Sequence, residues 1–474
     1  MCGAPQDAFE PHRDTAPAAP GAQTAQWRCI ICNYVHDGPE PPVECPVCGA
    51  SADQFEPVQA QQETTGKAES APRTVILGGG IAGTAAAEAV RESAPDAEIT
   101  LISAEKGLPY YRLNLSRYLA GEIGEDVLPI HPASWYEDQR IQLRSDVKAE
   151  EILADEREVR LHDGERVPFE KLILACGAHP FVPPIPGASR DGVHVFRTVD
   201  DARVLIDAAK PGARCLCIGG GILGLETAGG LARRGASVVV LESFEWLLPR
   251  QLNRGAGLLL EQYVAERGIA VRRAAKVIEI FGDARVSGVL LEGNERIPAD
   301  FVVITAGVRS NTHLARKAGL DVNQGIVVDN HLRTSHPDIL AAGDAAEHGG
   351  TVYGLWEPAR YQGVIAGHNA AGLSTEFGGL PRANTLKVLD IDLFSIGVVT
   401  PQDGSYDVVA EESEERYSRF VFHQNRLVGA IQLGDTRLAA AITKSIKGGT
   451  DFSGLLQRRP TAAAVRLHLM GGES

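Results

Sequence analysis

The chain has 474 residues, 44% of them hydrophobic, and a formal net charge of −15 at pH 7. The length predicts about three domains with substantial cores. The acidic balance argues against nucleic acid and anionic membranes as partners, and no run of 18 apolar residues indicates a membrane span. Because the N-terminus lacks the basic and apolar regions of a signal peptide, we expect a cytoplasmic protein. In that reducing compartment the eight cysteines indicate metal or redox chemistry.

The N-terminal part of the chain carries two cysteine pairs. Residues 1–25 are rich in Ala, Pro and Gln and are predicted to be disordered. The pairs Cys29-Ile-Ile-Cys32 and Cys45-Pro-Val-Cys48 follow, with twelve residues between them. This spacing is typical of a tetrahedral four-thiolate metal site, and so small a module is expected to need its metal to fold. Four sulfurs suit both iron and zinc, so the spacing leaves the metal open.

This module, residues 26–58, resembles rubredoxin in the form found at the end of rubrerythrins. The motifs Cys-x-x-Cys-x-Tyr and Cys-Pro-x-Cys-Gly both match, and the aromatic residues Trp27, Tyr34 and Phe55 surround them. The resemblance implies a single redox-active iron ion in the four-cysteine site, with structural zinc as the alternative. The polar residues 59–72 predict a flexible linker to the rest of the chain.

An apolar run beyond the linker ends in Gly78-x-Gly80-x-x-Gly83 and continues into an alanine-rich segment. This pattern is typical of a strand–turn–helix unit that binds a dinucleotide. The first glycine permits the turn, the second lets a pyrophosphate approach the backbone, and the third lets helix and strand pack closely. Glu105 lies 22 residues past Gly83, where a ribose-binding acid is expected. A glycine-rich turn without a ligand is the alternative.

The same order recurs at Gly219-x-Gly221-x-x-Gly224, with Glu242 18 residues past the last glycine. A meander of short strands follows each motif. The strand after the first meander closes with Ala175-Cys176-Gly177 and the strand after the second with Thr305-Ala306-Gly307. This internal repeat predicts two related nucleotide-binding units. Because no arginine directly follows Glu242 to hold a 2′-phosphate, NADH is predicted in preference to NADPH.

The cysteine distribution bears on the type of redox chemistry. No cysteine lies between residues 49 and 175, the region in which flavin disulfide reductases carry their reactive thiols on a helix. A thiol-based peroxidase or disulfide reductase is therefore disfavoured. Cys215 and Cys217 alternate on a predicted strand and Cys176 ends another, so we expect all three in the core. The 13 histidines form no ligand-spaced cluster and are assigned to no metal.

From residue 73 to about 450 the chain resembles the flavoprotein reductases with two dinucleotide-binding domains. These include NADH:rubredoxin reductases, ferredoxin reductases and the diaphorase part of assimilatory nitrite reductase. The resemblance implies an α/β fold with two Rossmann-like domains, a small α+β C-terminal domain and the N-terminal rubredoxin-like module. The expected boundaries are 73–188 and 298–376 for the FAD-binding domain, 189–297 for the NAD-binding domain, 377–455 for the C-terminal domain and 456–474 for a tail.

The resemblance also implies which residues bind the two nucleotides. FAD is expected to bind to Gly78, Gly80, Gly83 and Glu105. Arg112 and the Gly343-Asp344 pair are expected to contact its phosphates and ribityl chain, and Arg117 and Trp356 are expected near its ring. Arg117 departs from the lysine that the family usually has beside the flavin. NADH is expected on Gly219, Gly221, Gly224 and Glu242, with Glu226 near the nicotinamide. No residue is expected to act as a covalent catalyst.

The implied reaction is reduction of FAD by NADH, followed by transfer of single electrons to the iron of the attached module. An external redox partner such as a rubredoxin, a rubrerythrin or a flavodiiron protein would then take them. Nitrite reduction by this chain alone is not expected, because the siroheme and iron–sulfur portions are absent from the sequence. Two alternatives remain: an NADH oxidase or peroxide reductase acting at the flavin, and a non-enzymatic redox sensor with structural zinc.

Overall fold

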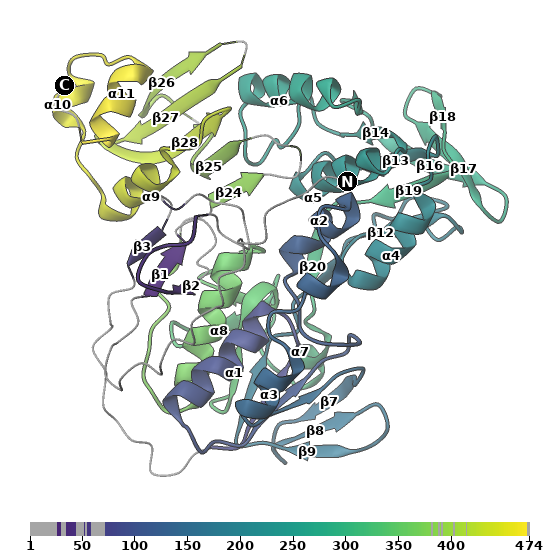
Figure 1. Ribbon diagram of the computed structural model, residues 1–474, viewed down its shortest axis with the longest axis vertical. Coiled ribbons are helices and arrows are strands. Elements are labelled where there is room, and N and C mark those ends of the chain that lie inside the picture. The colour runs from purple at the N-terminus through teal and green to yellow at the C-terminus, as the bar shows by residue number, and fades with distance from the viewer. Residues whose placement is uncertain are drawn as a thin grey trace, which may run out of the picture. The chain divides into compact units, whose positions relative to one another are not determined.

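The computed structural model (Figure 1) describes residues 26–29, 35–43, 52, 55–57, 72–380, 383–386, 389, 392–401, 403–413 and 415–471. The chain divides into two compact units, residues 1–61 and 62–474. None of the helices in the described ranges is both long enough and apolar enough to cross a membrane.

The first unit contains a small antiparallel sheet in the order β2-β1-β3. Its strands are β1 (Gln26–Cys29), β2 (Val35–Asp37) and β3 (Phe55–Pro57). In the central strand, Trp27 pairs with residues of both neighbours, and the Phe55 side chain is buried. Cys29 ends β1, whereas Cys32, Cys45 and Cys48 lie outside the described residues. The predicted disordered segment 1–25 and linker residues 59–71 also lie outside them.

The second unit begins with a parallel sheet in the order β22-β10-β4-β5-β6, which we call the first Rossmann-like domain. The strands are β4 (Thr74–Leu77), β5 (Ile99–Ile102), β6 (Ile141–Arg144), β10 (Lys171–Leu174) and β22 (Ile339–Ala341). All four residues of β4 are buried, as expected for a central parallel strand covered on both faces.

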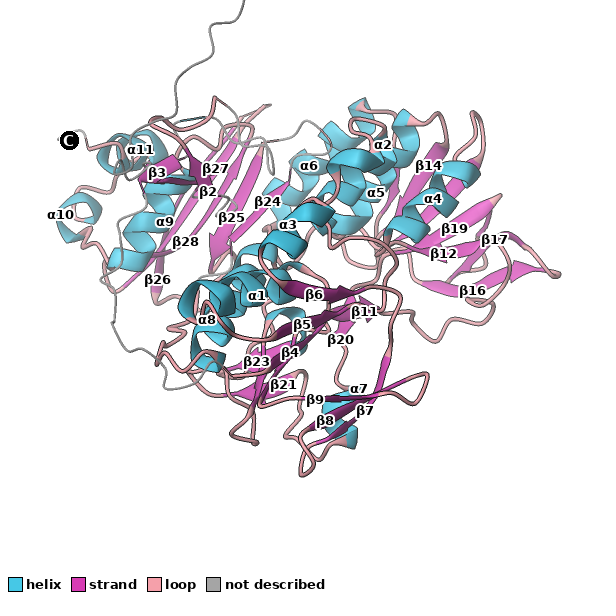
Figure 2. Ribbon diagram, turned by 60° about the horizontal axis from the view of Figure 1, so that its bottom comes forward, coloured by secondary structure: helices cyan, strands magenta, loops and turns pink. Residues whose placement is uncertain are grey.

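Helices α1 (Ile81–Ser93) and α8 (Trp356–Ala370) pack side by side against this sheet (Figure 2). Glycines make the close approach possible. A Cβ added to Gly363 would overlap the carbonyl oxygen of Ala82, and one added to Gly367 would lie 2.5 Å from the carbonyl oxygen of Ala86. The helix that follows the first glycine motif is therefore held in place by backbone-to-backbone contact with α8.

A second parallel sheet, in the order β12-β19-β13-β14-β15, forms the second Rossmann-like domain. The strands are β12 (Val193–Val195), β13 (Arg214–Ile218), β14 (Ser237–Leu241), β15 (Ala270–Arg272) and β19 (Phe301–Ile304), and the helices are α4 (Val199–Ala208), α5 (Ile222–Arg233) and α6 (Arg254–Glu266). In both sheets the strand before the glycine motif is central, with the strand before the acidic residue on one side. The predicted internal repeat is thus confirmed.

Shorter elements connect these two domains. Each domain carries an antiparallel meander, and strands β11 and β20 pair with each other where the chain passes between the domains. Their bounds are β7 (Ala149–Leu153), β8 (Glu158–Leu161), β9 (Arg166–Pro168), β11 (Ala178–Pro180), β16 (Val277–Gly282), β17 (Val286–Leu291), β18 (Arg296–Pro298), β20 (Val308–Ser310), β21 (Ile326–Val328) and β23 (Ala346–His348). The short helices are α2 (Leu115–Ala120), α3 (Ala133–Asp138), α7 (His313–Lys317) and the 3₁₀ turns Arg112–Asn114, Glu125–Val127 and Gly343–Ala345.

The C-terminal domain is a five-stranded antiparallel sheet in the order β24-β25-β28-β27-β26, with helices from the end of the chain. The elements are β24 (Ala383–Leu386), β25 (Leu393–Gly397), β26 (Tyr406–Glu412), β27 (Tyr417–His423), β28 (Arg426–Leu433), α9 (Ala439–Gly448), α10 (Ser453–Leu456) and α11 (Ala462–Leu469). Helix α11 lies within the segment assigned to a tail from the sequence. It contacts β26 and β27, buries Val465 completely, and joins Arg466 to Glu411 by an ion pair of 2.6 Å.

Candidate functional site

The first glycine motif forms a cradle at the end of β4. Gly78 has φ +123°, and a Cβ there would overlap the carbonyl oxygen of Ala175. A Cβ at Gly83 would overlap the carbonyl oxygen of Gly78, so the packing of α1 on the strand requires that glycine too. Gly80 differs, because a Cβ at this position would meet no heavy atom of the described chain within 4 Å. The space beside Gly80 fits a ligand group that approaches the backbone closely.

The second glycine motif repeats this geometry at the end of β13. Gly219 has φ +119°, and its added Cβ would lie 2.7 Å from the carbonyl oxygen of Thr305. A Cβ at Gly224 would overlap the carbonyl oxygen of Gly219, whereas one at Gly221 would again meet nothing described within 4 Å. In each cradle, the protein's own packing therefore requires the first and third glycines of the motif. It does not require the second glycine.

Each cradle opens onto the N-terminus of a helix. Gly80 is the N-cap of α1 and Gly221 is the N-cap of α5; both have extended backbone and no side-chain cap, and neither described helix has an acidic residue in its first turn. The first backbone N–H groups are thus left for another acceptor, and the helix dipole favours an anion. This arrangement suits the pyrophosphate of a dinucleotide.

Glu105 lies beyond the end of β5 and is surrounded by donors. Its Oε1 accepts a hydrogen bond of 2.6 Å from Nη2 of Arg112, and its Oε2 accepts one of 2.5 Å from the hydroxyl of Tyr110. Burial raises the pKa of the Tyr110 hydroxyl, which therefore stays protonated and able to donate. The structure thus brings two predicted FAD residues, Glu105 and Arg112, into direct contact.

The Gly343-Asp344 turn lies against the first cradle. Gly343 has φ +74°, and its added Cβ would lie 2.9 Å from the Cβ of Ala82 in α1. The carboxylate of Asp344 accepts a hydrogen bond of 2.9 Å from Nη2 of Arg197, whose carbonyl oxygen in turn accepts one from Arg112. Arg197 was not among the residues expected from the sequence. The only local signal is the capping box that follows it at Thr198, which marks a helix start and not a binding residue.

Buried polar atoms without partners lie close to this cluster. Asn114 Oδ1 and Trp356 Nε1 are buried and have no hydrogen-bond partner among the described residues. Trp356 begins α8. The centroid of its ring lies 6.2 Å from that of Tyr111, the residue directly before Arg112. Buried indole N–H groups usually have a partner. These orphaned atoms fit a region that is completed by a polar ligand such as FAD.

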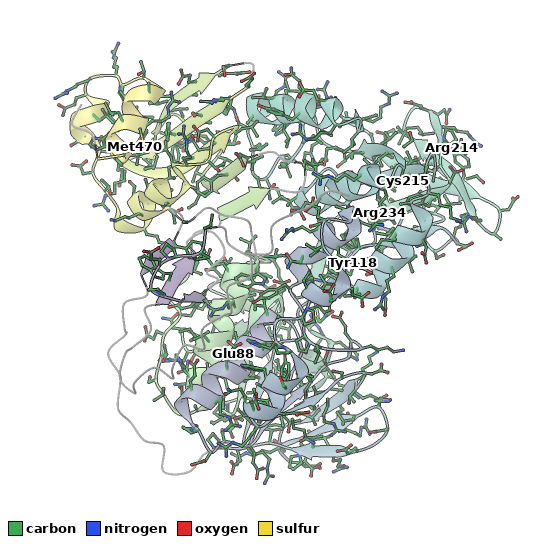
Figure 3. The ribbon with its side chains drawn as sticks, in the orientation of Figure 1. Glu88, Tyr118, Arg214, Cys215, Arg234 and Met470 are labelled. Carbon is green, nitrogen blue, oxygen red and sulfur yellow. The ribbon has the colours of Figure 1, made fainter. Side chains whose placement is uncertain are left out.

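Helices α2 and α5 connect the two Rossmann-like domains (Figure 3). Arg234, directly after α5, donates hydrogen bonds of 2.8 Å and 3.2 Å to the carbonyl oxygens of Leu119 and Tyr118 at the end of α2. A Cβ added to Gly230 would lie only 3.0 Å from Cγ of Leu119, so a glycine in α5 permits the close approach. This arrangement, the α2–α5 junction, fixes the helix carrying Arg117 against the helix carrying Glu226.

Arg117 and Glu226 have different partners at this junction. Arg117 lies 3.3 Å from Glu122, which also pairs with Arg233 at 2.5 Å. Burial raises the pKa of Glu226 to about 7, an effect that a hydrogen bond with Ser116 partly opposes. The structure therefore brings Glu226 to Ser116 of α2, while the arginine at the expected lysine position pairs with Glu122.

Glu242, at the end of β14, is 5% exposed and holds its own loop together. Its Oε2 accepts a hydrogen bond of 2.9 Å from the N–H of Gly220 in the second cradle, and its Oε1 accepts one of 2.9 Å from the N–H of Phe244. Oε1 also accepts a hydrogen bond of 3.2 Å from the hydroxyl of Ser243. A carboxylate offers about four acceptor positions, so one remains for a ribose hydroxyl. The structure places this acid directly beside the glycine loop.

Comparison with models of protein families identifies the family to which a chain with these two glycine cradles belongs. Residues 72–363 match the model of the pyridine nucleotide-disulphide oxidoreductases. The chain belongs to this family. Residues 383–450 match the rubredoxin NAD+ reductase C-terminal domain, and residues 27–56 match the rubredoxin-like domain of rubrerythrin. The predicted family, the predicted fold class and the predicted kind of enzyme, an oxidoreductase, are confirmed.

Relatives of this oxidoreductase have several names. An NADH-rubredoxin oxidoreductase from Clostridium acetobutylicum is 31% identical over 383 residues, covering 81% of this chain and 96% of that protein. The crystal structure of NADH:rubredoxin oxidoreductase from the same organism has a TM-score of 0.72 and 30% identity, covering 84% of this chain and 99% of that one. Nitrite reductase [NAD(P)H] from Bacillus subtilis is 34% identical over 383 residues, which are 80% of this chain. The chain spans about half of that reductase, 48% of its length.

The cysteines of this oxidoreductase differ in their surroundings. No group of three or more potential metal ligands occurs among the described residues, and the predicted set of Cys29, Cys32, Cys45 and Cys48 lies largely outside them. Cys215 and Cys217 are fully buried with their sulfurs 3.8 Å apart, which confirms that they belong to the core. Burial raises the pKa of Cys176 to about 12 and that of Cys215 well above its usual value. Cys176 is only partly buried and packs against the edge of the core, so it is less enclosed than expected. The raised pKa values keep the thiols of Cys176 and Cys215 protonated near neutral pH.

Proposed function

We propose that the protein is an NADH-dependent FAD oxidoreductase of the rubredoxin-reductase type, which delivers electrons to its own four-cysteine iron site and then to an external redox partner. The observation that carries the proposal is the pair of cradles at Gly80 and Gly221, each open on the ligand side and each at a helix N-terminus, in one chain with a rubredoxin-like domain. Bound FAD would supply hydride acceptance and release of single electrons.

The first Rossmann-like domain would hold FAD. Its pyrophosphate would lie at Gly80 and the N-terminus of α1, where Gly78 and Gly83 shape the loop, and Glu105 would accept its ribose hydroxyls. Arg112 and the Gly343-Asp344 turn, with Arg197, would position the phosphates and the ribityl chain. Trp356, with its unpartnered indole N–H, and Arg117 would lie near the ring.

The second Rossmann-like domain would hold NADH. Gly219, Gly221 and Gly224 with the N-terminus of α5 would bind the pyrophosphate, and Glu242 the adenosine ribose. Glu226 lies one turn into α5 and would approach the nicotinamide. Because its pKa is raised to about 7, its carboxyl group can donate as well as accept a hydrogen bond near neutral pH.

Two comparisons support a small redox protein as partner. The Clostridium acetobutylicum relative is named for rubredoxin. A crystal structure of a covalent putidaredoxin reductase–putidaredoxin complex also has a TM-score of 0.71 and 26% identity, covering 79% of this chain and 93% of the chain in that structure. We therefore infer that a rubredoxin, a rubrerythrin or a flavodiiron protein accepts the electrons, in the cytoplasm.

Replacing one cysteine of the proposed iron site tests this route of electron transfer. The Cys29→Ser variant should retain reduction of FAD by NADH, because both cradles lie in the other unit, but should lose most delivery to a rubredoxin acceptor. The measurements are flavin bleaching, acceptor reduction and metal content, with Cys2→Ser as the matched control. In the wild type, iron absorption should bleach on addition of NADH. Unchanged delivery by Cys29→Ser, or stoichiometric zinc in the wild type, would contradict the proposal.

Direct reaction of the reduced flavin with oxygen is the second candidate. It is favoured by an NADH oxidase from Methanocaldococcus jannaschii that is 30% identical over 341 residues, covering 69% of this chain and 76% of that protein. In this case Cys29→Ser would consume oxygen as fast as the wild type, with no added acceptor and at the full rate of NADH oxidation.

A further inference from the structure

The side chain of Phe244 is 55% exposed, although it belongs to the loop beside the second cradle. None of the other large hydrophobic side chains that are exposed in the described part of the chain is aromatic. Burying a phenylalanine stabilises a fold appreciably, so an exposed ring forgoes that gain. Phe244 follows Glu242, the proposed ribose-binding acid, by only two residues.

The backbone around this ring is held on both sides. The N–H of Phe244 donates to Glu242 at 2.9 Å, and its carbonyl oxygen accepts a hydrogen bond of 2.9 Å from the N–H of Ala274. Ala275 also donates to the carbonyl oxygen of Glu242 at 2.8 Å. Ala274 has φ +49°, a left-handed conformation that costs free energy and persists only where the surroundings impose it. The exposed ring is therefore carried by a fixed loop.

The ring also lies at the edge of the sheet where dinucleotides bind. Strands β19, β13 and β14 are parallel neighbours, so the loops after them meet at the carboxyl edge. In those loops a Cβ at Gly221 or at Gly307 would meet no described atom within 4 Å. With the pyrophosphate at Gly221 and the ribose at Glu242, the base comes next. Two residues of chain span at most about 7 Å, so the Phe244 ring is within reach of that base.

We propose that Phe244 stacks on the adenine of NADH and makes this subsite a purine-binding platform. The inference rests on the proposed function, because it takes NADH as the ligand of the second cradle. Stacking on an aromatic face uses the π surface that every base presents and does not depend on a particular pattern of hydrogen bonds. The platform would thus favour donors that carry a stacked base, as NADH carries adenine, over donors without one.

Two hydride donors separate this role from a general structural one. In the FAD-loaded Phe244→Ala variant, KM for NADH should rise by roughly 5- to 100-fold, the usual loss for one stacked base. KM for reduced nicotinamide mononucleotide, which has no adenine, should stay within about 2-fold of the wild-type value. The Phe244→Trp variant should bind NADH at least as well as the wild type. Ile278→Ala, which removes an aliphatic side chain that is 39% exposed in the same domain, is the matched control.

Calorimetry with ADP-ribose gives a readout that needs no turnover. Its Kd should rise by the same factor in Phe244→Ala and stay unchanged in Ile278→Ala. An unchanged Kd, or an equal rise of KM for both hydride donors, would overturn the stacking proposal. If NADH failed to reduce the flavin of the wild type, the proposed function itself would fall, whereas ADP-ribose would still test the stacking separately.

Discussion

At the scale of single residues, Gly80 and Gly221 are glycines that the protein's own packing does not require. Both have extended backbone, with φ −85° and −77°, and an added methyl group would meet no described atom within 4 Å. Alanine fits this conformation without strain. The methyl group would instead occupy the space proposed for the two pyrophosphates.

We therefore expect Gly80→Ala to lose FAD and Gly221→Ala to keep FAD but raise KM for NADH by at least about 10-fold, a loss near 1.4 kcal/mol. The free energy of unfolding of the cofactor-free protein should change by less than about 0.5 kcal/mol in both variants. Flavin content, KM and urea denaturation are the measurements. Gly78→Ala and Gly219→Ala are controls that should destabilise the protein, because an added Cβ there meets backbone at positive φ.

The carboxyl group of Glu226 makes stability depend on pH. Burial raises its pKa to about 7, so the folded protein holds a proton that the unfolded chain releases above about pH 4.5. This contribution to stability is complete below the unfolded pKa and is lost as the pH rises through 7. The free energy of unfolding of the cofactor-free wild type should therefore fall by on the order of 2 kcal/mol between pH 5 and 8 relative to Glu226→Gln.

Urea denaturation of both proteins at several pH values checks this expectation. The exposed Glu295→Gln variant is the control and should follow the wild type. Parallel curves for wild type and Glu226→Gln would contradict it.

Residues could be anticipated from the sequence where spacing alone defines them. The six motif glycines and the acids Glu105 and Glu242 follow from fixed offsets after an apolar strand. Arg197 could not be found in this way, because it reaches Asp344 only through the tertiary fold, 147 positions along the chain. The pairing of Arg117 with Glu122 likewise depends on how α2 ends, which no motif records.

At the scale of elements, the α2–α5 junction packs α2 closely against a helix of the second Rossmann-like domain. The guanidinium of Arg234 caps the C-terminus of α2 with two hydrogen bonds, and its charge also complements the helix dipole. Arg234→Ala should therefore lower the free energy of unfolding by about 2 kcal/mol, because charge-assisted bonds to half-buried carbonyls are lost. Arg233→Ala is the matched control. Its ion pair with Glu122 is 36% exposed on the arginine side and should contribute less than about 1 kcal/mol.

Thermal denaturation of both variants measures the difference. If hydride transfer depends on the position of α2, Arg234→Ala should also slow flavin reduction more than it raises KM for NADH. Equal stability of the two variants would show that Arg234 does not clamp the helices.

Elements with a buried apolar pattern were predictable, and exposed or interrupted ones were not. The central strands could be predicted from the apolar runs that precede each glycine motif. The apolar region 386–396 contains the end of β24 and most of β25, which pair antiparallel. Strand β26 was not expected because most of its side chains are exposed at the edge of the sheet. Helix α11 was not expected because it has only eight residues.

At the scale of the whole molecule, the repeat explains why the fold class was predictable. Two copies of strand, glycine turn, acid and meander require two similar sheets, and the observed strand orders match copy for copy. The rubredoxin-like domain could be recognised by its cysteine spacing alone, because domains as small as this one are defined by conserved ligand spacing rather than by a large core.

The burial of Cys215 and Cys217, together with the raised pKa of the partly buried Cys176, has a practical consequence for the complete protein. With two of these side chains wholly inaccessible and the third protonated well beyond neutral pH, a mild aromatic disulfide reagent would leave them untouched in the folded state. The remaining five of the eight cysteines are Cys2 and the proposed metal ligands. If the four proposed ligands hold a metal, the number of sulfhydryls that react under native conditions would rise by four as that metal is withdrawn, and the colour released by the reagent would report how much metal the protein holds.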